Sequence, residues 1–148
     1  MIHKKTLIPQ RLRTIQGSFA TIEHRFLRDG FWSTLSHHEL LLYFLLVLVS
    51  DRHGLSFYGY DKLCSLLQVS LDDYLEARNR LIQKDLIAFD GRIFQVLSLP
   101  DHPEDAPSSI LKTQSDMERS DPATVHLICR QAFGEKAMRK KHRQGGQT

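Results

Sequence analysis

Two clusters of histidines and carboxylates in the stretch SHHELLLYFLLVLVSDRHG could ligate a metal. His37, His38 and Glu39 stand at its start, and Asp51 and His53 stand near its end. If the stretch is a helix, a rise of 1.5 Å per residue puts the two clusters about 20 Å apart, so they cannot share an ion. No two histidines have the four-residue spacing of a helical zinc motif. The sequence therefore predicts capping and solvated side chains here, and no metal site.

The chain also lacks the patterns that carry catalysis. It has no phosphate-binding glycine loop, no nucleophile elbow and no paired carboxylates after a strand. Cys64 lies among leucines, which favours a buried and inert thiol. We therefore expect no enzyme activity, no catalytic residue and no cofactor.

Composition and charge indicate a different class of protein. The 148 residues are 41% hydrophobic and 25% charged, as in an ordinary globular protein. Residues 1–35 carry six Lys/Arg against two acids, whereas residues 36–100 carry six against eight. Basic arms are typical of proteins that bind a polyanion such as nucleic acid, although they also simply keep a chain soluble.

Targeting signals are not apparent. Two cysteines without C-x-x-C spacing favour a reducing compartment. The first 17 residues lack the apolar core of a signal peptide. We therefore expect a cytoplasmic location.

The central helix is strongly marked. Ser36 and Glu39 form an S-x-x-E capping box, and Gly54 stands where a left-handed cap is expected. The apolar run Leu40–Val49 has ten residues, about half of the ~20 that cross a bilayer, so we expect no membrane contact. Because the run is apolar on all sides, it needs cover from the N-terminal arm with Phe31 and Trp32, from the C-terminal helix, or from a second subunit.

Shorter elements follow in a regular order. We expect a strand at 55–57, a helix at 61–67, and a helix that Ser70 and Asp73 cap and that runs to about Lys84. Two apolar runs, 86–89 and 93–97, flank Asp90-Gly91, which predicts a hairpin with positive φ at both turn positions.

The chain then changes character. The proline-rich PDHPEDAPSS begins a linker, and Asp121-Pro122 opens a helix that runs to about residue 133. The predicted units are a basic arm at 1–35, a domain at 36–100, a linker at 101–120, and a helix with a basic tail at 121–148.

The segment LLQVSLDDYLEARNRLIQKDLIAFDGRIFQV resembles the winged helix-turn-helix domain of bacterial regulators and replication initiators. Val69-Ser70 lies at the turn. The residues that match buried positions are Tyr74, Ala77 and Leu81, and QKDLIAFDGRIF matches the entry to the wing. The resemblance spans residues 36–99. It implies a mainly α fold with a small β-hairpin wing and with N- and C-terminal extensions.

The resemblance also implies double-stranded DNA as the partner. The helix that begins at Ser70 would enter the major groove, and the wing would contact the backbone or the minor groove. The implied DNA-binding residues are Tyr60, Lys62, Ser70, Asp72, Asp73, Glu76, Asn79, Arg80, Lys84 and Arg92. The basic tail adds Arg139, Lys140, Lys141 and Arg143.

The sequence departs from this pattern on the second helix. Asp72, Asp73 and Glu76 would meet the phosphates, although Asp72 and Asp73 also complement the helix dipole. Arg78 falls within the apolar arc, where it needs a carboxylate partner or must reach outward to water. Asp85 stands where a glycine is usual before the wing, so this aspartate must adopt left-handed backbone.

Two functions remain open from the sequence. The first is a transcriptional regulator or an accessory protein of replication or transposition, in which a homodimer formed by the helix at 121–133 or by the arm would strengthen DNA binding. The second is a protein-interaction module, whose partner would bind Leu71, Leu75 and the acidic face. Fold alone does not decide between them.

Overall fold

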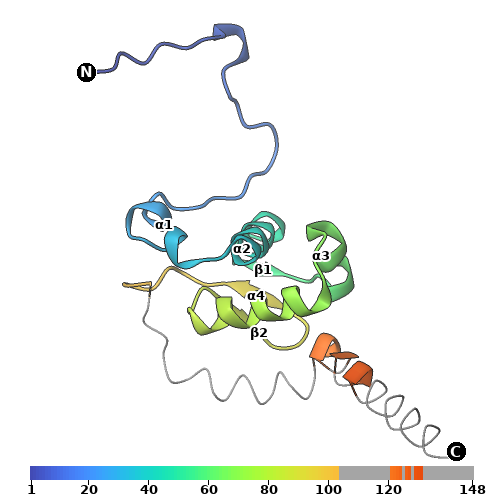
Figure 1. The fold of residues 1–148 in the computed structure, drawn as a ribbon. Coiled ribbons are helices and arrows are strands. Elements are labelled where there is room, and N and C mark those ends of the chain that lie inside the picture. The colour runs from blue at the N-terminus through green and yellow to red at the C-terminus, as the bar shows by residue number, and fades with distance from the viewer. Residues whose placement is uncertain (104–120, 125, 128, 132–148) are drawn as a thin grey trace, which may run out of the picture.

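The computed structural model describes residues 1–103, 121–124, 126, 127 and 129–131 (Figure 1). These residues form a mixed α/β structure in which helices pack on one small sheet. In chain order the elements are η1 (Pro9–Arg11), α1 (Arg25–Arg28), η2 (Trp32–Thr34), α2 (His37–Val49), β1 (Leu55–Ser56), α3 (Tyr60–Leu67), α4 (Leu71–Gln83), β2 (Ile87–Phe89) and β3 (Phe94–Val96).

The sheet is antiparallel and has the strand order β1-β3-β2. β3 pairs with β2 through Ala88 and Gln95, and with β1 through Leu55 and Gln95. β1 therefore extends the hairpin on the side opposite β2. This pairing brings the loop after β1 close to the β2–β3 turn.

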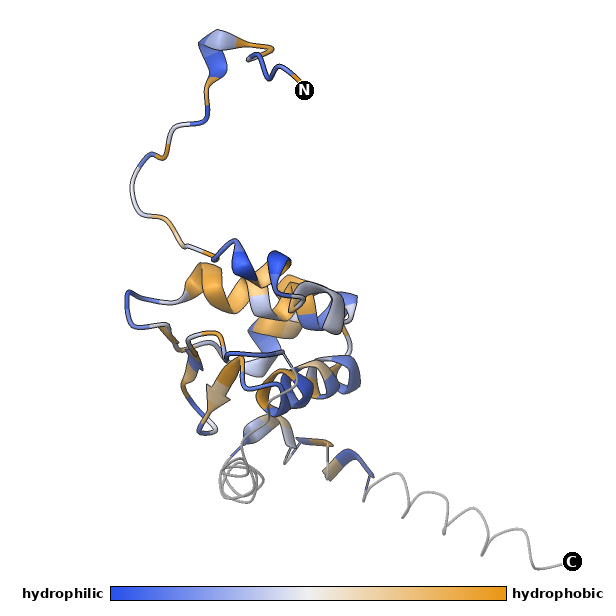
Figure 2. Cartoon of the chain, turned by 90° about the vertical axis from the view of Figure 1, so that its left-hand side faces the viewer, coloured by the Kyte–Doolittle hydropathy of each residue, from blue (hydrophilic) through white to orange (hydrophobic). Residues whose placement is uncertain are grey.

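The core surrounds α2, the helix that is orange along most of its length in Figure 2. α2 packs against α3, α4 and β3. Leu46 of α2, Leu63 of α3, Leu81 of α4 and Phe94 of β3 are completely buried. A helix with apolar residues all round is thus enclosed on most of its sides, as the sequence requires.

Aromatic side chains from α1 and η2 supply part of that cover. Phe26 stacks on Tyr43 of α2 with ring centroids 5.0 Å apart and on Phe31 at 6.2 Å. Phe31 is 1% exposed, so it anchors the segment before α2, as predicted. Trp32 also contacts Phe26 but stays 44% exposed.

One side of α2 remains uncovered. Leu41 is 49% exposed and Leu48 is 68% exposed. Residues 1–24 are all exposed, and the N-terminal part of this arm leads away from the body (Figure 1). Within the part of the chain that the structure describes, no helix is both long and apolar enough to cross a membrane.

The predicted caps form. Ser36 Oγ accepts from the backbone N–H of Glu39, whose carboxylate accepts from the backbone N–H of Ser36. Ser70 Oγ accepts from the backbone N–H at the third position of α4. Gly54 (φ 80°) and Asp85 (φ 59°) adopt the left-handed backbone that the sequence predicts for them.

The hairpin turn differs from the one that the Asp-Gly pair predicts. The last residue of β2 pairs with the first residue of β3, so four residues form the turn instead of two. Of these four, Gly91 alone has a positive φ (100°). Asp90 Oδ1 instead accepts from the backbone N–H groups of Arg92 and Ile93, at 2.8 and 2.7 Å. An aspartate that binds its own turn stabilises this wider form.

The segment from residue 121 packs against the body. Asp121 Oδ1 and Oδ2 accept from the backbone N–H groups of Ala123 and Thr124, which makes it the predicted helix cap. Ala123 is completely buried, and Leu127 packs against the core. The core thus extends beyond the predicted 36–100 unit, both here and at Phe26.

Candidate nucleic-acid interface

Exposed and half-buried aromatic rings gather with cations on one edge of the sheet. We call this the aromatic–cationic edge and define it as residues Phe57–Lys62 and Asp90–Ile93. Lys62 Nζ lies 4.6 Å from the ring centroid of Tyr58, and Arg92 Cζ lies 5.9 Å from that of Phe57. Phe57 is 68% exposed. Planar rings next to cations are the groups that bind bases and phosphates.

The hairpin turn holds Arg92 in place on this edge. The hydrogen bonds that Asp90 accepts from the backbone N–H groups of Ile93 and Arg92 lower its pKa. Its negative charge is therefore committed to the backbone of the turn. Arg92 has no carboxylate partner among the described residues, so its guanidinium is available to a phosphate.

The start of α3 supplies the other half of the edge. Tyr60 Oη lies 3.0 Å from Nδ1 of His126, which ties it to the C-terminal segment. The carboxylate of Asp61 folds back over Gly59, where an added Cβ would lie 2.7 Å from Oδ1. An acid in the first turn complements the helix dipole. Lys62 has no carboxylate within ion-pair distance among the described residues, which leaves its ammonium free for a ligand.

The polar face of α4 is arranged differently. Arg130 from the C-terminal segment donates to both carboxylate oxygens of Asp72, at 3.0 and 3.2 Å. Glu76 pairs with Arg80 at 2.8 Å, one turn further along the helix. Ser70 and Asp73 take part in the helix cap. Ion pairs thus offset two of the three carboxylates, and they also occupy Arg80.

Two more predicted DNA-binding residues have partners inside the protein. Lys84 Nζ donates to Glu39 Oε1 at 2.6 Å and to the carbonyl of Thr34 at 2.5 Å. Asn79 Oδ1 accepts from Arg78 at 3.2 and 3.3 Å. In these positions Lys84 links α4 to the start of α2, and it does not extend toward a ligand.

Arg78 is the buried charge of α4. Its side chain is 1% exposed, and Nη1 donates to Asp121 Oδ2 at 2.5 Å. Its guanidinium also lies over the rings of Tyr74 and Phe89, at 5.7 and 5.1 Å from their centroids. The sequence predicts that Arg78 needs a carboxylate or a path to water, and Asp121 supplies the carboxylate.

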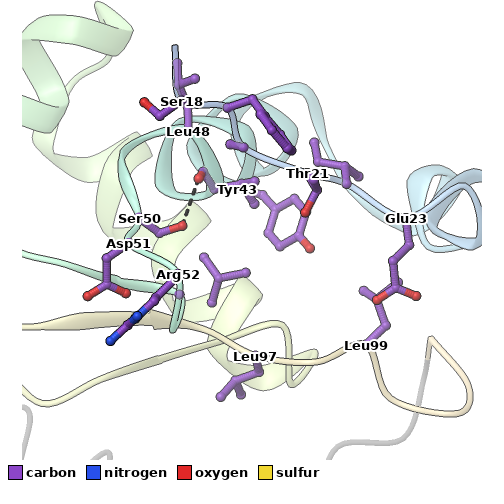
Figure 3. A pocket seen from close by; sticks show the side chains of 16 residues that line it. Ser18, Thr21, Glu23, Tyr43, Leu48, Ser50, Asp51, Arg52, Leu97 and Leu99 are labelled. Atoms are coloured by element: carbon purple, nitrogen blue, oxygen red, sulfur yellow. Dashed lines mark hydrogen bonds between the residues drawn. The ribbon is translucent and has the colours of Figure 1, made fainter. Parts of the chain in front are cut away.

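A separate cavity is lined by residues outside the aromatic–cationic edge (Figure 3). It measures 710 Å³, and residues 18–23 of the arm, the C-terminal half of α2 and residues 96–99 line it. Burial, together with the charge of Glu23, raises the pKa of Tyr43 to about 12, so its hydroxyl stays protonated at neutral pH. Ser50 donates to the carbonyl of Val47 at 2.8 Å.

The histidine and carboxylate clusters serve the ends of α2. His37 and His38 are exposed, whereas Glu39 is buried and binds Lys84. Asp51 Oδ1 accepts from the backbone N–H groups of His53 and Leu55. In the described ranges no three His, Cys, Asp or Glu side chains come together as metal ligands. Burial raises the pKa of Cys64, as does the nearby Asp61, and this keeps its thiol protonated.

The predicted basic tail lies outside the described residues. It comprises Arg139, Lys140, Lys141 and Arg143. The linker predicted at 101–120 is described only as far as residue 103.

Comparisons with protein-family models, with curated proteins and with solved structures find no match to this chain.

Two residues of the aromatic–cationic edge, Phe57 and Tyr58, are not among the contacts that the sequence predicts. Outside the edge, the sequence predicts Asp121 only as a helix cap. The run FYGYDK, in which aromatic residues precede a lysine, is the signal for the first two. No local pattern predicts that Asp121 pairs with Arg78, because the two residues are 43 positions apart.

Proposed function

We propose that this chain is a DNA-binding protein of the winged helix-turn-helix type, a transcriptional regulator or an accessory protein of replication or transposition. In this proposal α3 and α4 are the helix-turn-helix, and the β2–β3 hairpin is the wing. The order of α2, β1, α3, α4 and the hairpin supports it. The sharp turn at Gln68, which adopts left-handed backbone (φ 54°), also supports it.

One observation carries the proposal. Arg92 at the hairpin tip and Lys62 at the start of α3 lie on the same exposed edge, and neither has a carboxylate partner among the described residues. Two cations held on neighbouring elements suit two phosphates of one backbone. The arm adds Lys4, Lys5 and two arginines without any acid in residues 1–17, which suits sequence-independent attraction.

The geometry shifts the expected contacts away from α4. Asp72 and Glu76 have ion-pair partners, so they repel phosphate less than isolated carboxylates would. The same pairs leave α4 with few free donors for bases. We infer that the aromatic–cationic edge and the arm supply most of the affinity and that α4 supplies less.

Binding of a fluorescent duplex tests the proposal by anisotropy at low salt. We expect affinity that falls steeply as salt rises, because phosphate contacts release counterions. Arg92→Ala should weaken binding, whereas Arg28→Ala, which removes an exposed arginine of α1 that pairs with Asp29, should not. If no duplex binds at low salt, the proposal is wrong.

A second candidate function has its own observation. Leu41 and Leu48 leave an apolar side of α2 exposed, and exposed apolar side chains recur along the arm. Such surfaces favour a protein partner, as in a winged-helix interaction module or a homodimer. Sedimentation of the chain alone would detect self-association. If the chain binds no duplex but captures a defined protein partner, this candidate is favoured.

A further inference from the structure

A small recess opens at the aromatic–cationic edge. It has a volume of 240 Å³ and lies between the loop that follows β1, the β2–β3 turn and the start of the C-terminal segment. Its lining is mostly aromatic, with Phe57, Tyr58, Tyr60, Tyr74 and Phe89. Pockets for drug-sized ligands measure about 300–1,000 Å³, so this recess suits a single planar group.

The floor of the recess is firmly built. Tyr74 and Phe89 are 1% and 7% exposed, and the Arg78 guanidinium lies over both rings. Asp121 neutralises that guanidinium and also lines the recess. A buried ion pair with this many contacts holds the two rings in fixed positions, so the floor does not need to rearrange when a ligand enters.

One polar group of the floor is unused. The Tyr74 hydroxyl is buried and has no hydrogen-bond partner among the described residues. Burial raises the pKa of Tyr74, so the hydroxyl stays protonated and can both donate and accept. A buried polar group without a partner is costly. The hydroxyl has almost no accessible surface, so it is not itself a contact for a ligand in the recess.

The cations beside the recess favour a negatively charged ligand. Lys62 already lies over Tyr58, and Arg92 already lies over Phe57. A cationic ligand would meet two like charges there. A planar ring that carries a phosphate fits better, because the ring stacks on an aromatic face and the phosphate reaches Lys62 or Arg92.

We propose that this recess binds one unpaired base of DNA, at a duplex end or a locally opened site, with its phosphate held by Arg92 and Lys62. The inference rests on the proposed DNA binding and names the form of DNA that the edge prefers. Phe57, exposed at the mouth of the recess, is the stacking residue.

The test compares a blunt duplex with the same duplex carrying a short single-stranded overhang that contains 2-aminopurine. Anisotropy measures the affinity, and quenching of 2-aminopurine fluorescence reports stacking. We expect the overhang duplex to bind about tenfold more tightly, with quenching, and Phe57→Ala to abolish both differences. Leu66→Ala, an exposed apolar residue of α3 outside the recess, and Phe57→Tyr should retain both.

The outcomes separate this inference from the proposed function. Equal binding of both duplexes without quenching would overturn the base site and leave duplex binding intact. Binding of neither DNA would overturn both proposals. Strong quenching of a free 2-aminopurine nucleotide, without any preference for the overhang, would assign the recess to a free nucleotide and overturn the DNA site.

Discussion

The polar face of α4 and the aromatic–cationic edge both carry charged side chains, but they use them differently. On α4, Asp72 and Arg80 are bound by charges of the same chain, and Arg78 is buried with Asp121. On the edge, Lys62 lies over the half-buried ring of Tyr58 and Arg92 lies over the exposed ring of Phe57, and neither cation has a carboxylate partner among the described residues. Charged side chains on a helix face are therefore free for a ligand only where they have no partner within the protein.

The largest expected effect concerns the buried charge of α4. Asp121→Ala leaves the charge of Arg78 buried without a carboxylate partner and removes the helix cap, so the free energy of unfolding should fall by about 3–5 kcal/mol. Chemical denaturation measures this change. Asp101→Ala removes an exposed aspartate and is the control. An unchanged unfolding midpoint for Asp121→Ala would show that the pair is not structural.

The next effect concerns the edge. The double variant Lys62→Ala/Arg92→Ala removes two predicted phosphate contacts. We expect duplex affinity to fall by about 10- to 100-fold and the salt slope to decrease by about 2.

Arg80→Ala provides the contrast on α4. Because Arg80 already pairs with Glu76, its loss should change duplex affinity less than either edge substitution does. A larger effect from Arg80→Ala than from Arg92→Ala would reverse the comparison between the two regions.

A smaller effect should appear as pH dependence where α4 meets α2. Burial raises the pKa of Glu39, but hydrogen bonds from Lys84 and Ser36 outweigh it, and the net pKa is lowered from 4.5. A lowered carboxyl pKa adds stability that is present above pH 4.5 and is lost as the pH falls through the folded value.

Glu39→Gln tests this link. We expect the unfolding free energy at pH 7 to fall by about 2 kcal/mol and the acid limb of the stability profile to become shallower. Glu23→Gln removes an exposed glutamate of the arm and serves as the control. Parallel acid limbs for wild type and Glu39→Gln would contradict the assignment.

The smallest effect tests whether DNA lies near the exposed face of α4. Glu76→Gln removes a carboxylate from the exposed face of α4 and frees Arg80. If DNA lies near this face, affinity for duplex should rise by about two- to threefold, because less negative charge faces the phosphates. If DNA stays on the aromatic–cationic edge and away from this face, duplex affinity should not change.

Much of the fold follows from local sequence rules. Ser36, Glu39 and Ser70 mark helix starts, because a helix cap joins a side-chain oxygen to a backbone N–H group only three residues away. Asp85 marks left-handed backbone for an equally local reason. The apolar run of α2 predicts a buried helix, since ten residues are too few for a bilayer.

The rest depends on contacts between distant residues. Lys84 looks like a DNA contact in sequence, but Glu39 and Thr34 bind it from across the core. The edge arises because β1 pairs with β3, which brings Phe57 beside Arg92. The β2–β3 turn has four residues where the sequence predicts two, because Asp90 Oδ1 accepts from the backbone N–H groups of Arg92 and Ile93.

The most direct test of the account is a map of backbone amide shifts in the NMR spectrum as duplex DNA is added at low salt. The account predicts the largest changes at Phe57–Lys62 and Asp90–Ile93, with smaller changes along the exposed face of α4. Changes confined to α4, or to the apolar side of α2 around Leu41 and Leu48, would contradict it.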